Sequence, residues 1–270
     1  MADQQDTRNR LTIRAGSDTL TFSASDPQKS CRMVCEPYEV NMAIAMAANL
    51  REAFNTSKML QENYQKAMVL VNAPTMLVPL DEYEEDDVET LYHSCFSGQE
   101  GCTVHTSVIP SLNAVAAFAV NKDLKTVVTD HFNDVRFMPI GQPVWEHLHS
   151  RGSSQTVNGY GHELFAYFHD DSMEVFCFQQ NRFKFYNVYD AQHAHDALYF
   201  LLYAWKQLGF DAENDTLHLV GELRQRSWLM EKLHQYLRHV YAVTTAAEFQ
   251  LSNEPIPEGG TYDLLALYNR

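Results

Sequence analysis

The sequence predicts a mixed α/β protein built from two similar units with a cleft between them. The first observation is a repeated beginning. Residues 11–22, LTIRAGSDTLTF, and residues 165–178, FAYFHDDSMEVFCF, each read as two strands around a short polar turn. The second observation is that each beginning is followed by helical patterns alternating with short apolar runs. This order favours a sheet with an antiparallel hairpin at one edge and parallel strands joined through helices. Both hairpin turns are expected to point into the cleft.

The first half of the chain carries more elements than the second. It opens with a hairpin over 11–15 and 19–24 and a third strand at 31–37. Apolar side chains from Met42 to Phe54 recur at helical spacing and predict a helix with one apolar face. The elements expected after it are a strand at 67–72, a helix at 81–96 with an acidic first turn, a strand at 113–120, a helix at 122–132, a strand at 135–140 and a helix at 142–151.

The second half repeats the opening order with fewer additions. Its expected elements are strands at 162–170, 173–180 and 182–190, a helix at 191–208 closed by Gly209, a strand at 216–221, a helix at 223–240 and a strand at 241–246. Residues 150–161, SRGSSQTVNGYG, are polar and rich in Gly and Ser, which is typical of a linker. We therefore expect a first lobe with extra elements at 8–152, a linker at 153–159 and a second lobe at 160–270.

Composition excludes several classes of function. The chain has 270 residues, of which 45% are hydrophobic, and a formal net charge of −15. Such a surface repels nucleic acid, which is bound through Lys and Arg. No apolar run reaches the ~18 residues of a membrane span. Five cysteines without a disulfide-scaffold spacing, and an N-terminus without an apolar signal region, predict a cytoplasmic protein with reduced thiols.

Three stretches carry a resemblance to a known fold family. They are ELFAYFHDDSMEVFCF at 163–178, the run from FYNVY to DALYFLLYAWKQLGF ending at Phe210, and LHLVGELRQRSWLMEKLHQYL at 217–237. In this combination the chain resembles a bacterial family of unknown function with an actin-like ATPase fold. The resemblance implies two tandem ribonuclease-H-like lobes around a central cleft. The chain is also similar to pilus-assembly relatives of actin.

The resemblance also implies where a nucleotide would bind. In active members of the superfamily both hairpin turns carry an acidic residue and glycine near the phosphates, and a strand–glycine–helix segment packs on adenosine. Here Ile13 and Arg14 stand where the resemblance implies a metal-holding Asp, and the second turn has no glycine. In the third segment Glu222 follows Gly221, where the family pattern favours a second small residue. Phosphate binding needs backbone N–H groups in close approach, which glycine permits. All three positions are thus degraded, and the cleft candidates are Gly16, Ser17, Asp170, Asp171, Gly221 and Glu222.

Each candidate also has a structural interpretation. Asp170 and Asp171 can hold Mg²⁺, but Asp is also common in ordinary polar turns, and the sequence favours the turn. Gly16 fits a turn glycine, and Gly221 fits a strand-to-helix turn. His193 and His195 cannot share an ion on a helix, because positions i and i+2 point apart. We predict no catalytic residues and no metal site.

Two main hypotheses about function remain, beside a third in which the fold is a structural relic with another small ligand in the cleft. The first is a non-catalytic actin-like protein that binds a protein partner or serves as a scaffold, with no cofactor. The second is a divergent ATPase or kinase-like enzyme that binds Mg-ATP in the cleft through Asp170, Asp171 and Gly221. A fold alone never decides between such functions.

Overall fold

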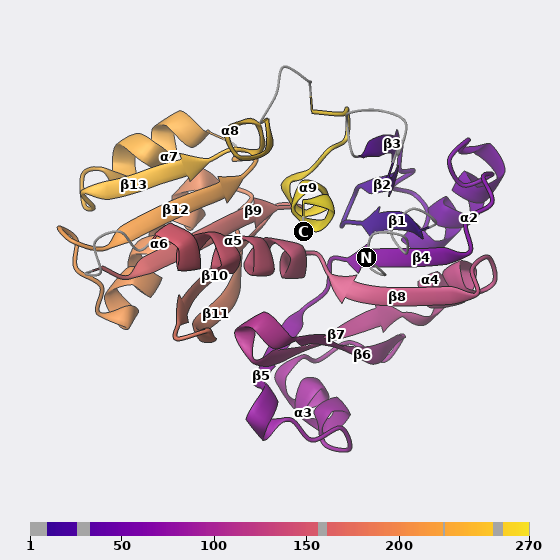
Figure 1. Ribbon diagram of the computed structural model, residues 1–270, viewed down its shortest axis with the longest axis horizontal. Coiled ribbons are helices and arrows are strands. Elements are labelled where there is room, and N and C mark those ends of the chain that lie inside the picture. Colours follow the sequence, from indigo (N-terminus) through magenta and orange to yellow (C-terminus); the bar gives the residue numbers. More distant parts are fainter. Residues whose placement is uncertain (1–9, 26–32, 156–160, 224, 251–255, 270) are drawn as a thin grey trace.

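The structure is a computed structural model that describes residues 10–25, 33–155, 161–223, 225–250 and 256–269. Within these ranges the strands form two five-stranded sheets and one three-stranded sheet (Figure 1). Each five-stranded sheet forms the centre of one lobe. The three-stranded sheet lies beside the first lobe.

The sheet of the first lobe has the order β3-β2-β1-β4-β8. Its strands are β1 (Arg10–Ala15), β2 (Leu20–Ala24), β3 (Val34–Tyr38), β4 (Lys66–Val71) and β8 (Asp134–Pro139). The first three strands pair antiparallel, whereas β4 and β8 run parallel to β1. Central strands β1 and β4 are buried almost throughout, as expected where helices and other elements cover both faces of a sheet.

The sheet of the second lobe repeats this plan strand by strand. Its order is β11-β10-β9-β12-β13. The strands are β9 (Glu163–His169), β10 (Ser172–Gln179), β11 (Arg182–Asp190), β12 (Thr216–Gly221) and β13 (His239–Val243). Again three antiparallel strands precede two parallel ones. The doubled hairpin-plus-parallel-strand plan predicted from the sequence is therefore confirmed.

Helices on the sheets complete a hydrophobic core in each lobe. In the first lobe α2 (Met46–Thr56) and α4 (Lys122–Thr129) pack on the sheet, and in the second α6 (Ala194–Leu208) and α7 (Arg226–Leu233) do so. The Asn121 side chain caps α4 by accepting from the N–H groups of Asp123 and Leu124. Gly209, at φ 69°, ends α6 as predicted.

The extra elements of the first lobe are a small sheet and its helix. The sheet has the order β5-β7-β6 and is antiparallel. Its elements are β5 (Thr75–Pro79), the short helix η2 (Leu80–Glu82), α3 (Val88–Cys95), β6 (Cys102–Ile109), η3 (Pro110–Leu112) and β7 (Ala114–Asn121). The acidic run of residues 82–87 precedes α3 and is largely exposed.

A third core joins the two lobes. Helix α5 (Gly141–Gln155) follows β8, α8 (Thr245–Phe249) follows β13, and α9 (Tyr262–Tyr268) ends the described chain. Figure 1 shows α9 between the two five-stranded sheets, and it packs on α5. Trp145 of α5, Leu70 of β4, Tyr167 of β9 and Leu264 of α9 are all buried in this shared core. Because apolar surface is buried between the lobes, their relative motion is restricted.

Several expectations about single elements are wrong in their bounds. Helix α2 begins at Met46, and Met42 lies outside it with 71% of its surface exposed. The cause is Asn49, which is fully buried and bonds the backbone of Asn41, so residues 41–45 form turns instead of helix. Helix α7 ends at Leu233, because residues 239–243 pair with β12 as a strand.

Other expectations concern residues outside the described ranges, and some observed elements were not expected. The segment expected as a linker at 153–159 begins as the last residues of α5, and residues 156–160 lie outside the described ranges, as does Cys31. Strands β5 and β6 and helices α8 and α9 were not predicted. Of the described helices, none is both long enough and apolar enough to cross a membrane.

Candidate functional site

The two hairpin turns predicted to face each other do so. Residues 16–19 join β1 to β2, and Asp170 and Asp171 join β9 to β10. The hydroxyl of Thr19 donates a 3.0 Å hydrogen bond to Oδ1 of Asp170. Both turns contribute to the lining of one cleft, which confirms this part of the sequence analysis.

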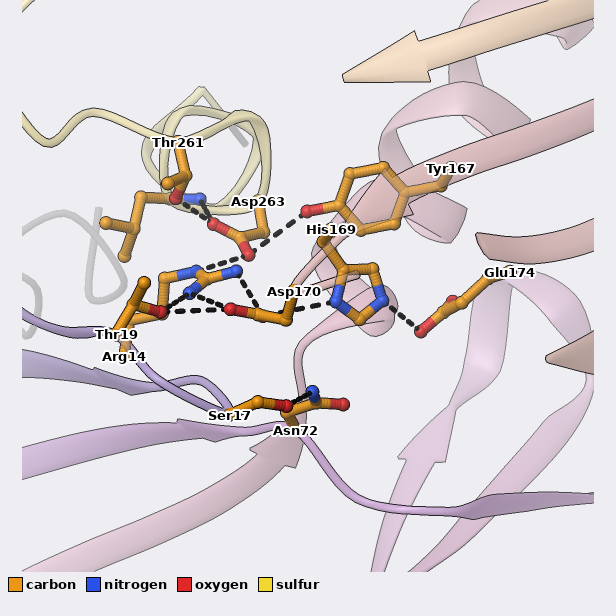
Figure 2. Close-up of polar contacts among 11 residues, drawn as sticks. Arg14, Ser17, Thr19, Asn72, Tyr167, His169, Asp170, Glu174, Thr261 and Asp263 are labelled. Atoms are coloured by element: carbon orange, nitrogen blue, oxygen red, sulfur yellow. Dashed lines mark hydrogen bonds and ion pairs between the residues drawn. The ribbon is translucent and has the colours of Figure 1, made fainter. Parts of the chain in front are cut away.

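Arg14 occupies the space between the turns (Figure 2). It stands near the end of β1 and only 3% of it is exposed. Its guanidinium donates to Oδ2 of Asp263 at 2.7 Å and to Oδ2 of Asp170 at 2.8 Å. A further bond of 2.9 Å reaches the Thr19 hydroxyl. Burial by itself lowers the pKa of Arg14, but the charges of Asp263 and Asp170 outweigh it and raise the pKa above its ordinary value.

Asp263 brings the last helix into this network. It stands in the first turn of α9 and is fully buried. Besides Arg14, it accepts from the Tyr167 hydroxyl at 3.1 Å, from the backbone N–H of Leu264 at 2.6 Å and from the Thr261 hydroxyl. A carboxylate in the first turn of a helix also benefits from the helix dipole. Each carboxylate oxygen of Asp263 therefore has at least two hydrogen-bond donors.

His169 extends the network into the second lobe (Figure 2). Its ring contacts Asp170 through Nδ1 at 3.3 Å and Glu174 through Nε2 at 3.0 Å. Glu174 in turn accepts from Nε1 of Trp145 on α5 at 2.8 Å. Burial opposes the charged imidazolium, but the bonds to Asp170 and Glu174 raise the pKa of His169 to about 9. His169 is therefore protonated at neutral pH.

Asp170 is charged because two cations hold it. Burial favours its neutral form, but the hydrogen bond from His169 and the charge of Arg14 keep its pKa well below the usual range. The whole network has two cations, Arg14 and His169, against three carboxylates, Asp170, Glu174 and Asp263.

The second turn has an unusual backbone for its residues. Asp170 has φ 44° and Asp171 has φ 60°, so both are left-handed, as in a type I′ hairpin turn. Asn-Gly is the common pair in this turn, and Asp tolerates the conformation less well than Gly. Contacts of the Asp170 side chain with Arg14, Thr19 and His169 help to hold it.

The candidate glycines Gly16 and Gly221 stand where other atoms of the chain approach the backbone closely. A Cβ on Gly16 would collide with Thr19 Oγ1, Asp170 Oδ1 and Arg14 Nη1. Gly221 has φ 89°, and its Cβ would lie 2.7 Å from the Phe168 carbonyl oxygen. Ser17 lies in the same turn as Gly16, and its hydroxyl accepts a 2.8 Å hydrogen bond from Asn72.

The cleft has a volume of about 760 Å³ and takes residues from both lobes. Asp170, Asp171, Gly221 and Glu222 line it, whereas Gly16 and Ser17 do not. Thr261 and Tyr262, at the beginning of α9, also contribute. Among the described residues, no three His, Cys, Asp or Glu side chains are placed to hold a metal ion together.

Sequence reasoning found part of this site and missed the rest. The sequence singles out Arg14 by its unexpected position but does not indicate that Asp263 is its partner. It also does not indicate that Glu174 is the partner of His169. One signal was available, because a charged residue in the apolar strand LTIRA needs a buried counter-ion. The sequence does not indicate which carboxylate supplies this counter-ion, because Asp263 lies 249 positions from Arg14.

The architecture matches that of known proteins. A structure from Bacteroides thetaiotaomicron, of a protein with an actin-like ATPase fold and unknown function, matches with a TM-score of 0.80 and 24% identity, over 100% of this chain and 99% of that chain. A chain of the PilM–PilN type IV pilus biogenesis complex matches with a TM-score of 0.60 and 10% identity, over 97% of each chain. At such identities the likeness establishes the fold alone.

The sequence comparisons identify a family. No curated protein matches the sequence. A family model described as "Protein of unknown function (DUF3822)" matches residues 1–240, which is most of the chain. The two ribonuclease-H-like lobes thus form an actin-like ATPase fold, and the chain belongs to the DUF3822 family of proteins of unknown function.

Proposed function

We propose that the protein is a non-catalytic binding or scaffold protein, and that its cleft does not serve as a Mg-ATP site. The observation that carries the proposal is the position of Arg14, whose guanidinium is paired with Asp170 and Asp263 between the two hairpin turns. A cation that belongs to the chain itself thus stands at one of the two positions, 13 and 14, where the resemblance to active members implies a metal-holding carboxylate.

The donor set fits Mg²⁺ poorly. Magnesium prefers oxygen ligands, usually one or two carboxylates together with waters and phosphate oxygens. Both carboxylate oxygens of Asp170 already accept from Arg14, Thr19 or His169. Two buried cations, Arg14 and His169, would repel a metal ion at this carboxylate.

The phosphate positions fit a triphosphate no better. Gly16 leaves no room for a phosphate beside it, because Thr19, Asp170 and Arg14 fill the space a Cβ would take. The second turn places two carboxylates, Asp170 and Asp171, on the cleft. Arg14 cannot serve as a phosphate anchor, since two carboxylates already neutralise it.

Binding of a protein partner is supported by the rigid frame and by a structural neighbour. The lobes share a hydrophobic core, which restricts their motion relative to each other. The shape of the cleft and the positions of the outer surfaces are therefore kept. The matching chain of TM-score 0.60 is part of a type IV pilus biogenesis complex, and therefore works in an assembly with another protein. We propose that this chain also acts by assembling with a partner.

A second candidate, a divergent Mg-ATP-binding ATPase or kinase-like enzyme, has one observation in its favour. The cleft of about 760 Å³ lies between the lobes and is lined by Asp171 and Gly221. Pockets of about 300–1,000 Å³ are typical of small-ligand sites. Asp170 and Asp171 would then be the carboxylates that hold a metal ion.

A thermal-shift experiment with Mg-ATP tests the proposal. A ligand at a hundred times its dissociation constant adds about 2.7 kcal/mol to the free energy of unfolding, which raises the melting temperature by several degrees. We expect no such rise at millimolar Mg-ATP for the wild-type protein. A rise that is lost in Asp171→Asn, but retained when exposed Glu85 is changed to Gln, would overturn the proposal in favour of the enzyme.

A further inference from the structure

The cleft is larger than the Arg14 network requires. Its walls come from residues 18–21 at the beginning of β2, from residues 37–40 at the end of β3, from the β9–β10 turn, from α6 and from residues 221–223 at the end of β12. Its volume of about 760 Å³ lies in the upper part of the range for ligand pockets, which is about 300–1,000 Å³. The chemistry of these walls restricts what the cleft can bind.

The described lining residues include two cationic side chains, Arg14 and His169. Arg14 contacts the carboxylates of Asp170 and Asp263, and His169 contacts those of Asp170 and Glu174. Both cations are therefore neutralised within the chain, and among the described lining residues a polyanion would meet no uncompensated positive charge.

Three exposed carboxylates stand around the cleft. Asp18 belongs to the β1–β2 turn, Glu39 follows β3, and Glu222 follows β12, so they come from both lobes. All three are exposed, and within the described ranges none of them forms an ion pair. Walls of low dielectric constant concentrate the field of such charges and favour a positively charged ligand.

Apolar side chains also line the cleft. Tyr38 and Val40 line it from the first lobe and Leu223 from the second, and all three are half-buried, so part of their surface is open to a ligand. Covering such surface contributes about 25 cal/mol for each Å² removed from water. A ligand that fits therefore carries apolar groups as well as positive charge.

We infer that the cleft binds a basic and apolar peptide segment of a partner protein. The inference rests on the proposed binding function and names the chemistry of the partner. A metal ion does not fit, because the carboxylates do not gather into a coordinating cluster within the described residues. A chain with Lys or Arg beside aliphatic or aromatic residues does fit, since it can place separate charges against Asp18, Glu39 and Glu222.

A peptide selection tests the inference with the full chain. A phage library of random heptapeptides is selected on three proteins in parallel: the wild type, a rim variant with Asp18→Asn, Glu39→Gln and Glu222→Gln, and a control variant with Glu84→Gln, Glu85→Gln and Asp86→Asn. The control removes the same charge from the exposed acidic run before α3. It separates an effect of the cleft from an effect of overall net charge.

We expect the wild type and the control to enrich peptides with Lys or Arg next to aliphatic or aromatic residues. Synthetic copies of these peptides, followed by fluorescence anisotropy, should bind the rim variant at least about tenfold more weakly and should lose affinity with added salt. Enrichment of acidic peptides, equal enrichment on all three proteins, or no enrichment would overturn the inference.

The selection is repeated with millimolar Mg-ATP to separate this inference from the proposed function. Peptide binding that persists, with no thermal shift by Mg-ATP, supports both. Failure of the selection together with an absent thermal shift removes the peptide site and leaves the proposed function standing. If Mg-ATP shifts the melting temperature and displaces the peptides, the proposed function is overturned. The inference that the cleft is a peptide site, and not a nucleotide site, is then overturned as well.

Discussion

Arg14 and Asp263 are 249 positions apart in the sequence, and Nε of Arg14 donates a 2.7 Å hydrogen bond to Oδ2 of Asp263. The pair ties β1 of the first lobe to α9, which packs on α5 in the core shared by the lobes. Asp170 adds the hairpin of the second lobe to the same guanidinium. One side chain therefore connects both lobes and the last helix across the base of the cleft.

Asp263→Asn should destabilise the protein strongly. Removing one partner of a buried ion pair typically costs about 3–5 kcal/mol, because the remaining charge is left buried without compensation. We expect the lower end of this range, since Asp170 still compensates Arg14 and Asn keeps the shape of Asp. Urea unfolding followed by circular dichroism measures the change.

Asp18→Asn is the control for this variant. Asp18 is an exposed carboxylate of the same cleft and lacks an ion pair within the described part of the chain. Its loss should change the free energy of unfolding by no more than about 0.5 kcal/mol. Equal stabilities of the two variants would show that the Arg14–Asp263 pair contributes nothing to the fold.

Stability should fall at alkaline pH because of His169. Its pKa is about 9 in the folded protein, above the value of about 6.5 expected in the unfolded chain. A group whose pKa is raised on folding stabilises the fold fully below its unfolded pKa, and this contribution is lost as the pH rises through its folded pKa. The difference between the two values corresponds to about 3 kcal/mol.

His169→Gln isolates this contribution from other groups that titrate at high pH. Urea unfolding of both proteins is measured between about pH 6 and pH 10. The wild type should be more stable than the variant near pH 6, and the difference should shrink steadily toward pH 10. A difference that stays constant over this range would mean that His169 does not carry a stabilising proton.

Stability should also fall in acid because of Asp170. Its pKa is held below the ordinary value by the bond from His169 and the charge of Arg14 against the opposing effect of burial. A group whose pKa is lowered on folding stabilises the fold above its unfolded pKa, which is about 3.9 for Asp. That contribution is lost as the pH falls below this value toward the folded pKa.

Asp170→Asn should flatten the acid limb of the stability curve, measured by unfolding between about pH 2 and pH 6. Asp18→Asn is the control, because Asp18 is an exposed carboxylate of the first hairpin turn that forms no ion pair within the described part of the chain. We expect the acid limb of the control to keep the slope of the wild type. A flattened acid limb in the control, with that of Asp170→Asn unchanged, would contradict the assignment of the strongly held carboxylate to Asp170.

The sheets were predictable because their signals are local. Each hairpin shows as two apolar runs around a polar turn, and the runs at 67–72 and 216–221 are short and apolar enough to indicate buried strands. Strand β6 has polar residues at four of the eight positions of CTVHTSVI and is only half-buried, so its pattern is weak. Helix α9 is short, and its place depends on the shared core, which forms only in the tertiary structure.

The site was predictable only where its residues lie in the turns. Asp170, Asp171 and Gly16 stand in turns that the hairpin pattern singles out, and Gly221 stands at the turn between a predicted strand and a predicted helix. Asp263 and Glu174 lie in a helix and a strand, where a carboxylate usually faces solvent. Their burial depends on Arg14, His169 and Trp145, which reach them from other elements. No property of a single sequence indicates these pairings.

Gly221→Ala tests whether this glycine is kept for the fold. A side chain at φ 89° is strained, and its Cβ would also lie 2.7 Å from the carbonyl oxygen of Phe168, its partner across the β9–β12 pairing. Gly98 is a matched control, because it has φ 80° and nothing within 4 Å of its Cβ position. Strain of this kind costs about 1–3 kcal/mol.

We expect Gly98→Ala to lower the free energy of unfolding, measured with urea, by about 1 kcal/mol. Gly221→Ala should lower it by at least about 2 kcal/mol more, because the backbone atoms near its Cβ cannot move aside easily. The extra loss would mean that the strand-to-helix turn itself requires glycine at 221. If the two variants lose the same amount, the close approach to Phe168 relaxes easily and the fold does not demand this glycine. A requirement for close approach by a ligand would then become the better explanation of Gly221, which favours the nucleotide-binding alternative.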